Sequence, residues 1–165
     1  MELRRWWRHW TFPHARVRKL FPRRVLQAIE DAIRVSERHH LGELRFVVEG
    51  GLDWPLLWRG VSARERALEL FSQLRVWDTE HNSGVLIYLQ LADRRVEIIA
   101  DRGIHKKVGA DTWRRLCADM ERAFRAGRFE EGALQGVQAI GRLLAEHFPA
   151  PADNPDELPD APLVL

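Results

Sequence analysis

The sequence contains one cysteine, Cys117, among its 165 residues, and it contains no long apolar run. A single cysteine excludes an internal disulfide, so nothing in the chain requires an oxidising compartment. No apolar stretch approaches the roughly 20 residues that a helix needs to cross a bilayer. The first ten residues, MELRRWWRHW, place arginine and tryptophan where a signal peptide would have aliphatic residues. We therefore expect a cytoplasmic protein.

The sequence also lacks the motifs of dedicated phosphatases and of nucleotide-binding loops. No cysteine is separated from a following arginine by five residues, no Asp-x-Asp-x-Thr follows a predicted strand, and no Arg-His-Gly occurs. The glycines at 50–51 and at 132 and 136 lack the lysine and the strand-turn-helix setting of a phosphate-binding loop. Cys117 falls on an apolar helical face, which is typical of a core residue. A strong phosphoryl-transfer enzyme is therefore not expected.

The formal net charge of +2 conceals an uneven distribution along the chain. Residues 1–24 contain eight Lys/Arg and one acid, whereas the remaining residues contain 18 basic and 23 acidic groups. The body is mildly acidic and the basic charge lies in the N-terminal arm. This distribution argues against nucleic-acid binding, because such binding needs a basic face on the folded body.

The first ten residues predict a short helix with two distinct faces. Leu3, Trp6, Trp7 and Trp10 share one face, and the other face carries arginine. Such a helix could lie on an anionic membrane surface, which would place the protein at the periphery of the inner membrane. The more common role of an apolar face on a short helix is burial against the domain's own sheet or a partner protein. Both interpretations stay open.

Helical and strand patterns alternate through the rest of the chain. Ser62 and Glu65 have the spacing of a capping box at the start of one helix. Asp111 or Thr112 is the expected cap of another helix. We expect loops over residues 50–61, with tryptophans packing over the core, and after Gly103. The predicted helices cover residues 22–40, 62–74, 112–126 and 129–148, and the predicted strands cover residues 43–49, 84–91 and 96–101.

The order of these elements predicts an α/β fold. A strand, helix, strand crossover makes 43–49 parallel to 84–91, and a tight turn makes 96–101 antiparallel to 84–91. Strand 84–91 is apolar on both faces, so helices should cover the small mixed sheet on both sides as an αβα sandwich. We expect three regions, namely a basic Trp-rich arm over 1–21, an α/β domain over 22–148 and a Pro/acid-rich tail over 149–165. The tail should be an extended arm whose apolar end could be pinned to the body.

The predicted hairpin brings acidic and amide side chains to one edge of the sheet. Asp78, Glu80 and Asn82 precede the first strand, and Asp101 follows the second, so antiparallel pairing places them on the same edge. The parallel strand adds Glu43 to this edge and places Glu49 at the opposite one. Oxygen ligands of these types suit Ca²⁺ or Mg²⁺. The alternative is that the same side chains form turns and surface ion pairs.

A catalytic interpretation of this edge is also possible. Asp78, Asp101 and His105 are the candidates, because carboxylates holding a metal can activate water for phosphoester hydrolysis. His81 is expected on the same edge. The cations Arg102, Lys106 and Lys107 could hold a phosphate oxygen.

Several segments together resemble the TPM domain family over residues 22–148. They are a crossover helix that ends at Trp77, the strand NSGVLIYL, the turn LADRRVEI, the segment ADRGI and the late helix GRFEEGALQGVQAIGRLL. The resemblance implies an α/β sandwich with helices on both faces of a small sheet. It also implies weak acid phosphatase activity in some plant members, with a role in photosystem repair. For several members it implies divalent-cation binding at the acidic edge.

The sequence departs from the family in four features. Many bacterial members are exported, membrane-anchored and Gly-rich at the C-terminus, and we expect none of these features here. Many members have an aspartate at the start of the first helix, where this sequence reads Phe21-Pro22-Arg23-Arg24.

We expect a non-catalytic accessory or binding module, acting with a protein partner in protein or membrane quality control. The alternative is a weak metal-dependent acid phosphatase.

Overall fold

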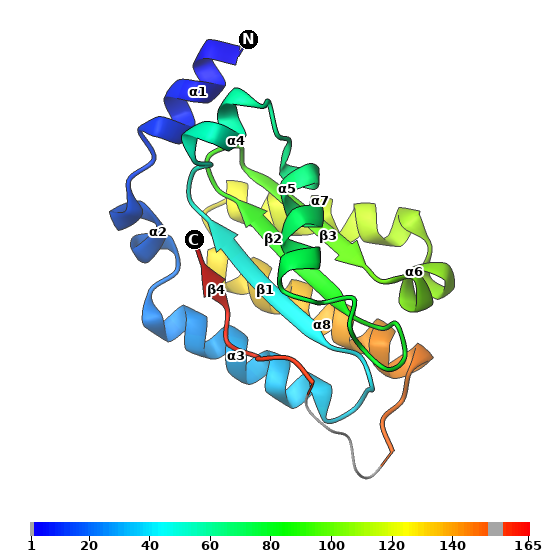
Figure 1. The fold of residues 1–165 in the computed structure, drawn as a ribbon. Helices are drawn as coiled ribbons and strands as arrows, with labels where there is room; N and C mark the ends of the chain where they lie inside the picture. The colour runs from blue at the N-terminus through cyan, green and yellow to red at the C-terminus, as the bar shows by residue number, and fades with distance from the viewer. Residues whose placement is uncertain (1, 152–156) are drawn as a thin grey trace.

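The computed structural model describes residues 2–151 and 157–165 and contains a four-stranded mixed sheet (Figure 1). The strand order is β3-β2-β1-β4, with β1 parallel to β2 and to β4, and with β3 antiparallel to β2. The predicted crossover and hairpin are therefore confirmed. The strands are β1 (Leu44–Glu49), β2 (Val85–Gln90), β3 (Arg95–Ala100) and β4 (Leu163–Val164).

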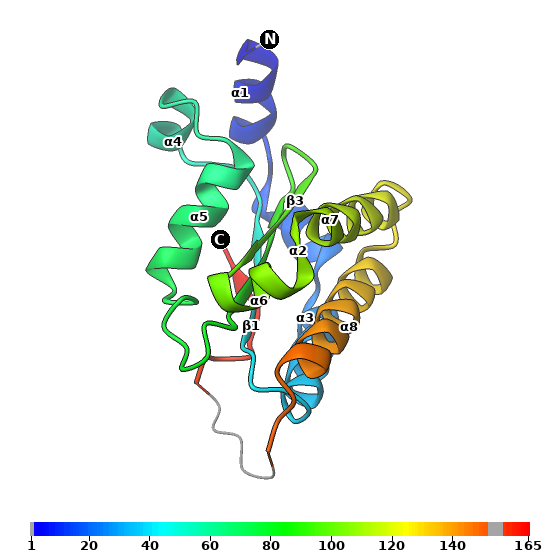
Figure 2. The same ribbon diagram turned by 90° about the vertical axis from the view of Figure 1, so that its right-hand side faces the viewer.

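Helices cover both faces of the sheet, as Figure 2 shows from the side. α5 lies on one face, and α3, α7 and α8 lie on the other. This arrangement confirms the αβα sandwich. The helices are α1 (Glu2–Trp10), α2 (His14–Leu20), α3 (Arg23–Glu37), α4 (Trp54–Trp58), α5 (Ala63–Gln73), α6 (Arg102–Val108), α7 (Ala110–Arg125) and α8 (Phe129–His147).

The strands divide the interior into two apolar cores because successive side chains point to opposite faces. Phe46 and Ile87 point toward α3 and α8 and belong to the larger core. Val47 and Leu86 point toward α5 and belong to the smaller one. All residues of β1 and β2 are buried, as expected for strands covered on both sides.

The structure differs from the predictions at three short segments. The predicted loop over 50–61 contains α4, and the predicted loop after Gly103 is largely α6. α7 begins at Ala110, and its N-cap residue is Gly109, so no side chain caps the helix. The predicted cap, Asp111 or Thr112, is wrong. Helices of five and seven residues are too short to show a helical period in sequence. Ser62 and Glu65, in contrast, form the predicted capping box.

The C-terminal arm, residues 157–165, returns to the sheet and adds its last residues as β4. Val47 pairs with Leu163, and the Leu165 N–H donates to the Val48 carbonyl at 2.9 Å. The expectation that the apolar end of the tail is pinned to the body is confirmed.

Candidate functional site

The predicted acidic edge begins with a close approach between the loop before β2 and the start of α6. The Asp101 N–H donates to the Gly84 carbonyl at 2.9 Å, and the Ile104 N–H donates to the Asn82 carbonyl at 3.3 Å. Asn82 has a φ of 52°. A Cβ at Gly103 would lie 2.5 Å from the Asn82 oxygen, so only glycine fits there. The hairpin therefore places Asn82 and Asp101 side by side.

Asp101 is buried and its carboxylate caps α6. Its Oδ1 atom accepts a hydrogen bond from the Arg102 N–H at 2.6 Å. Its Oδ2 atom is buried and has no hydrogen-bond partner within the described ranges. His105 and Lys106 lie on the same short helix, and both are exposed to solvent.

Glu43, the predicted contribution of the parallel strand, holds the C-terminal arm. Its Oε1 accepts from the Glu157 N–H at 3.2 Å and its Oε2 accepts from the Leu158 N–H at 3.0 Å. Arg45, also buried, donates to the Pro159 carbonyl. Two buried side chains, one directly before β1 and one within it, therefore bind the main chain of the arm.

A buried carboxyl pair, Glu37 and Asp160, joins α3 to the arm. Glu37 accepts from the Leu44 N–H at 2.9 Å and shares a hydrogen bond with Asp160. Burial, followed by the bond with Asp160 and the charge of Glu43, raises the pKa of Glu37 to about 10. A pKa raised in this way favours the neutral form of Glu37, which lowers the repulsion between the two adjacent carboxyl groups.

The other predicted ligands lie on the surface. Asp78 and Glu80 are exposed, and Glu80 reaches the arm through its N–H, which is 3.3 Å from Glu157 Oε2. Across residues 2–151 and 157–165, no three His, Cys, Asp or Glu side chains are grouped so as to hold a metal ion. The structure thus brings Asn82 to Asp101, but it gives both Glu43 oxygens to backbone N–H groups. The Ca²⁺ or Mg²⁺ site therefore stays a prediction.

The opposite edge of the sheet contains a partly buried ion pair. Arg66 Nη2 lies 2.9 Å from Glu49 Oε1, and the Tyr88 hydroxyl donates to the same carboxylate. Burial, then the charge of Glu49, raises the pKa of Tyr88. Elsewhere, burial raises the pKa of Cys117 to about 11, which agrees with a core role for that thiol.

The most exposed apolar surface in the described part of the chain lies elsewhere, where α1 and α4 meet. We call this surface the tryptophan end. Trp6 packs against Trp54 and Trp58, with ring centroids 5.0 and 5.6 Å apart. Trp7 and Trp10 contact each other at 6.1 Å and remain exposed. The tryptophan end comprises Leu3, Trp6, Trp7, Trp10, Trp54 and Trp58.

The sequence showed only half of this surface. The helical period of α1 identified its own tryptophans, whereas Trp54 and Trp58 lay in a predicted loop. Two features mark WPLLW as a short helix: Asp53 stands directly before the segment, and a proline lies in its first turn. They are the signal that could have found α4.

The polar face of α1 attaches the tryptophan end to the body. Arg5 Nε donates to Asp93 Oδ2 at 2.9 Å, and Arg5 Nη2 donates to the Val61 carbonyl at 2.6 Å. His9, fully buried, accepts at Nδ1 from the Leu52 N–H at 2.9 Å and places Nε2 3.0 Å from Asp93. A Cβ at Gly51 would lie 2.5 Å from the His9 carbonyl oxygen, so the backbones are in direct contact.

Asp93 is the centre of this attachment. Burial acts to raise the pKa of Asp93, but the hydrogen bonds from His9 and Arg5 outweigh it and lower that pKa to about 2. The side of α1 that faces the body is therefore the Arg5 and His9 side. Of the predicted apolar face, only Trp6 is half-buried, against α4.

The described residues include no helix with the length and apolar character that crossing a membrane requires.

Comparison with known proteins agrees with the fold. The model of the TPM domain matches residues 17–143. The NMR structure of the BA42 protein from the psychrophilic bacterium Bizionia argentinensis is similar with a TM-score of 0.75 and 31% sequence identity, covering 86% of this chain and 92% of that one. The solution structure of the N-terminal domain of a P. gingivalis protein is similar in fold, with a TM-score of 0.59, 24% identity, and 74% and 76% coverage. No curated protein sequence matches significantly. The chain therefore belongs to the TPM domain family.

Proposed function

We propose that this TPM domain is a non-catalytic binding module and that the tryptophan end is its binding surface. One observation carries the proposal. Four tryptophans from two helices, Trp7, Trp10, Trp54 and Trp58, each expose more than half of their surface on one end of the molecule. Large grouped apolar surfaces of this kind are typical of interaction sites.

The contacts of the acidic edge also support a non-catalytic module. Glu43 binds the arm and Asp101 caps α6, so both stabilise the fold. Carboxylates that bind backbone N–H groups are held in place and are poorly available to a substrate.

A weak metal-dependent acid phosphatase is the second candidate, and one observation favours it. The Oδ2 atom of Asp101 is buried and unpartnered among the described residues, and such atoms often mark functional positions. Asp78 and His105 would complete the candidate set, and Ca²⁺ or Mg²⁺ would activate water there.

A phosphoester assay separates the two functions. Purified protein is incubated with a generic aryl phosphate and Ca²⁺, Mg²⁺, Mn²⁺ or chelator. The wild type is compared with the Asp78→Asn, Asp101→Asn double variant. A binding module gives no metal-dependent hydrolysis, or equal traces in both proteins. Metal-dependent hydrolysis that the double variant loses would establish the phosphatase instead.

A further inference from the structure

The tryptophan end exposes an unusual amount of aromatic surface for a folded protein. The exposed fractions are 64% for Trp7, 76% for Trp10, 59% for Trp54 and 68% for Trp58. A groove of about 260 Å³ runs between the two helices, lined by Trp6, Trp7, Trp10, Leu52, Trp54 and Leu57. Leaving this surface in water is costly, since apolar area contributes about 25 cal/mol per Å² when buried. A partner that covers it would recover that free energy.

This surface is presented by an anchored helix. Arg5 and His9 attach α1 to Asp93 and to the backbone near α4. Trp6 packs on both α4 tryptophans and fixes the angle between the helices. The exposed rings are therefore held in one orientation before binding, and little conformational entropy is lost when they are covered.

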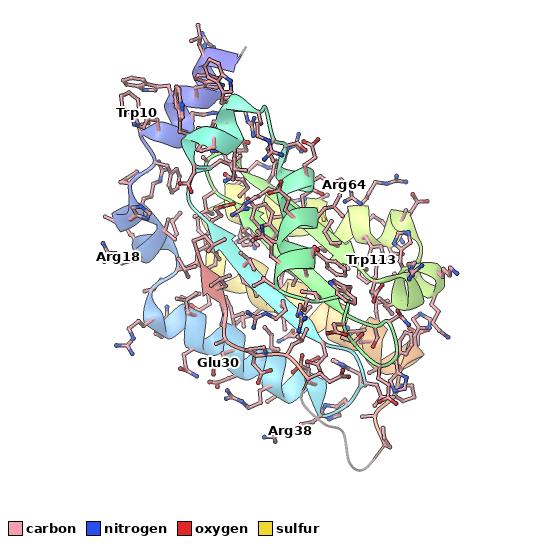
Figure 3. The ribbon with its side chains drawn as sticks, viewed as in Figure 1. Trp10, Arg18, Glu30, Arg38, Arg64 and Trp113 are labelled. Atoms are coloured by element: carbon pink, nitrogen blue, oxygen red, sulfur yellow. The ribbon has the colours of Figure 1, made fainter. Side chains whose placement is uncertain are left out.

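The shape of this end suits a broad surface. Figures 1 and 2 show α1 and α4 projecting from one end of the sandwich, beyond the sheet. In Figure 3, Trp10 lies at this end, on the side of α1 that faces away from the sheet. A projecting aromatic end can enter a bilayer interface without any matching cleft in the partner.

The charges around the rings identify the chemistry of the partner. Arg4 and Arg8 are exposed on α1, which also carries Trp7 and Trp10, and the exposed Arg59 directly follows Trp58 in the chain. Arg8 gives one contact to Asp93 at 3.2 Å, and Arg59 lies 3.8 Å from Glu69, so both remain mostly solvated. Indole rings prefer the headgroup level of a bilayer, and guanidinium groups bind lipid phosphates. Exposed tryptophans with exposed arginines on the same two segments therefore favour an anionic lipid surface over a neutral one.

We propose that the tryptophan end docks on the surface of an anionic lipid bilayer. The indole rings of α1 and α4 lie at the headgroup level, and Arg4, Arg8 and Arg59 contact lipid phosphates. This inference rests on the proposed function, because it names the partner of the same surface. α1 acts with α4 as one docking unit, so the tryptophans of α4 contribute although they lie about 50 residues from those of α1 in sequence.

Vesicle co-sedimentation tests the proposal with the full chain. One set of vesicles contains equal parts of phosphatidylglycerol and phosphatidylcholine, and the other contains phosphatidylcholine alone. We expect the wild type to bind the anionic vesicles and to bind the neutral ones at least tenfold more weakly. Its tryptophan emission should shift to the blue only with the anionic vesicles.

Two pairs of variants separate the aromatic and charged contributions. Trp7→Ser with Trp58→Ser should lower vesicle affinity more than tenfold, whereas Trp77→Ser should leave it unchanged, because Trp77 is exposed outside the tryptophan end. Arg4→Gln with Arg59→Gln should lower affinity about 25-fold, at about fivefold for each arginine near an anionic surface. Arg38→Gln is the charge control, since Figure 3 places Arg38 at the opposite end of the molecule.

The other outcomes of the vesicle experiment would overturn the lipid assignment. Absence of vesicle binding by the wild type, or equal binding to neutral vesicles, overturns the lipid assignment. A wild-type dimer that becomes monomeric in the Trp7→Ser, Trp58→Ser variant, without vesicle binding, assigns the surface to a second copy of the chain and also overturns it. These results leave the binding-module proposal in place. That proposal fails only if Asp101-dependent phosphoester hydrolysis is found.

Discussion

The anchoring of α1 through Asp93 gives a prediction whose size follows from the structure. Asp93→Asn keeps the shape of the side chain but removes the charge that Arg5, Arg8 and His9 contact. The Asp93 side chain is 12% exposed, and its pKa falls from 3.8 to about 2 in the fold. A difference of this size corresponds to about 2 kcal/mol of stabilisation at neutral pH.

The sign of the pH dependence is fixed by the direction of this shift. Because the folded pKa is lower than the unfolded one, the stabilisation is present above about pH 4 and is lost as the pH falls through about 2. The difference between wild type and Asp93→Asn should therefore shrink from about 2 kcal/mol at pH 7 to about 1 kcal/mol at pH 3.

Hydrogen exchange of the α1 amides measures this free energy directly, because α1 can open without unfolding the sheet. At pH 7, opening of the segment that includes the Thr11 N–H, bonded to the Trp7 carbonyl, should be about 30-fold more frequent in Asp93→Asn. Asp53→Asn is the matched control, since Asp53 is exposed and makes no side-chain cap bond. Exchange in α1 that is the same in Asp93→Asn and wild type would refute the proposed anchor.

Two further predictions concern the other buried charges. Arg66→Met should destabilise the protein by about 3–5 kcal/mol in urea unfolding, because it leaves the Glu49 carboxylate buried without its cation, and adding Glu49→Leu should restore most of the loss. A single variant as stable as the wild type would contradict this. Glu43→Gln should lower the free energy that holds the arm on the body by about 1–3 kcal/mol and speed carboxypeptidase release of Leu165 at least fivefold. The control Glu80→Gln, at an exposed residue, should not change the release rate. Equal release rates in the two variants would show that Glu43 does not hold the arm.

The sheet and its main helices could be predicted because their signals are local. The capping box at Ser62 and the apolar periods of α3 and α8 lie within single segments. The crossover rule then fixed the parallel pairing of β1 with β2, and it placed Glu43 and Glu49 at opposite edges. The topology rules thus led from the locally predicted helices and strands to the correct strand pairing.

The parts that sequence missed depend on contacts between distant residues. Glu43 meets the arm at Leu158, 115 residues away, so its two N–H partners could not be inferred from its neighbours. Arg5 meets Asp93, 88 residues away, and this contact decides which face of α1 turns to the body. The pattern of α1 alone indicated an amphipathic helix, but it did not indicate which face would be exposed.

The tryptophan end shows the same limit. The helical spacing of the tryptophans in α1 is visible in the sequence. α4 is a five-residue helix, too short for Trp54 and Trp58 to show such a spacing. Only the fold brings Trp6 against them. The surface therefore exists as one unit in the structure and as two unrelated segments in the sequence.

Fluorescence quenching by brominated lipid tests the central proposal most directly. The intact protein is mixed with vesicles of phosphatidylglycerol and phosphatidylcholine whose acyl chains carry bromine near the headgroup. Docking by the tryptophan end predicts strong quenching that the Trp7→Ser, Trp58→Ser variant loses in large part and that Trp77→Ser retains. Emission that the brominated vesicles leave unchanged, or quenching that is equal in all three proteins, would contradict docking by this surface.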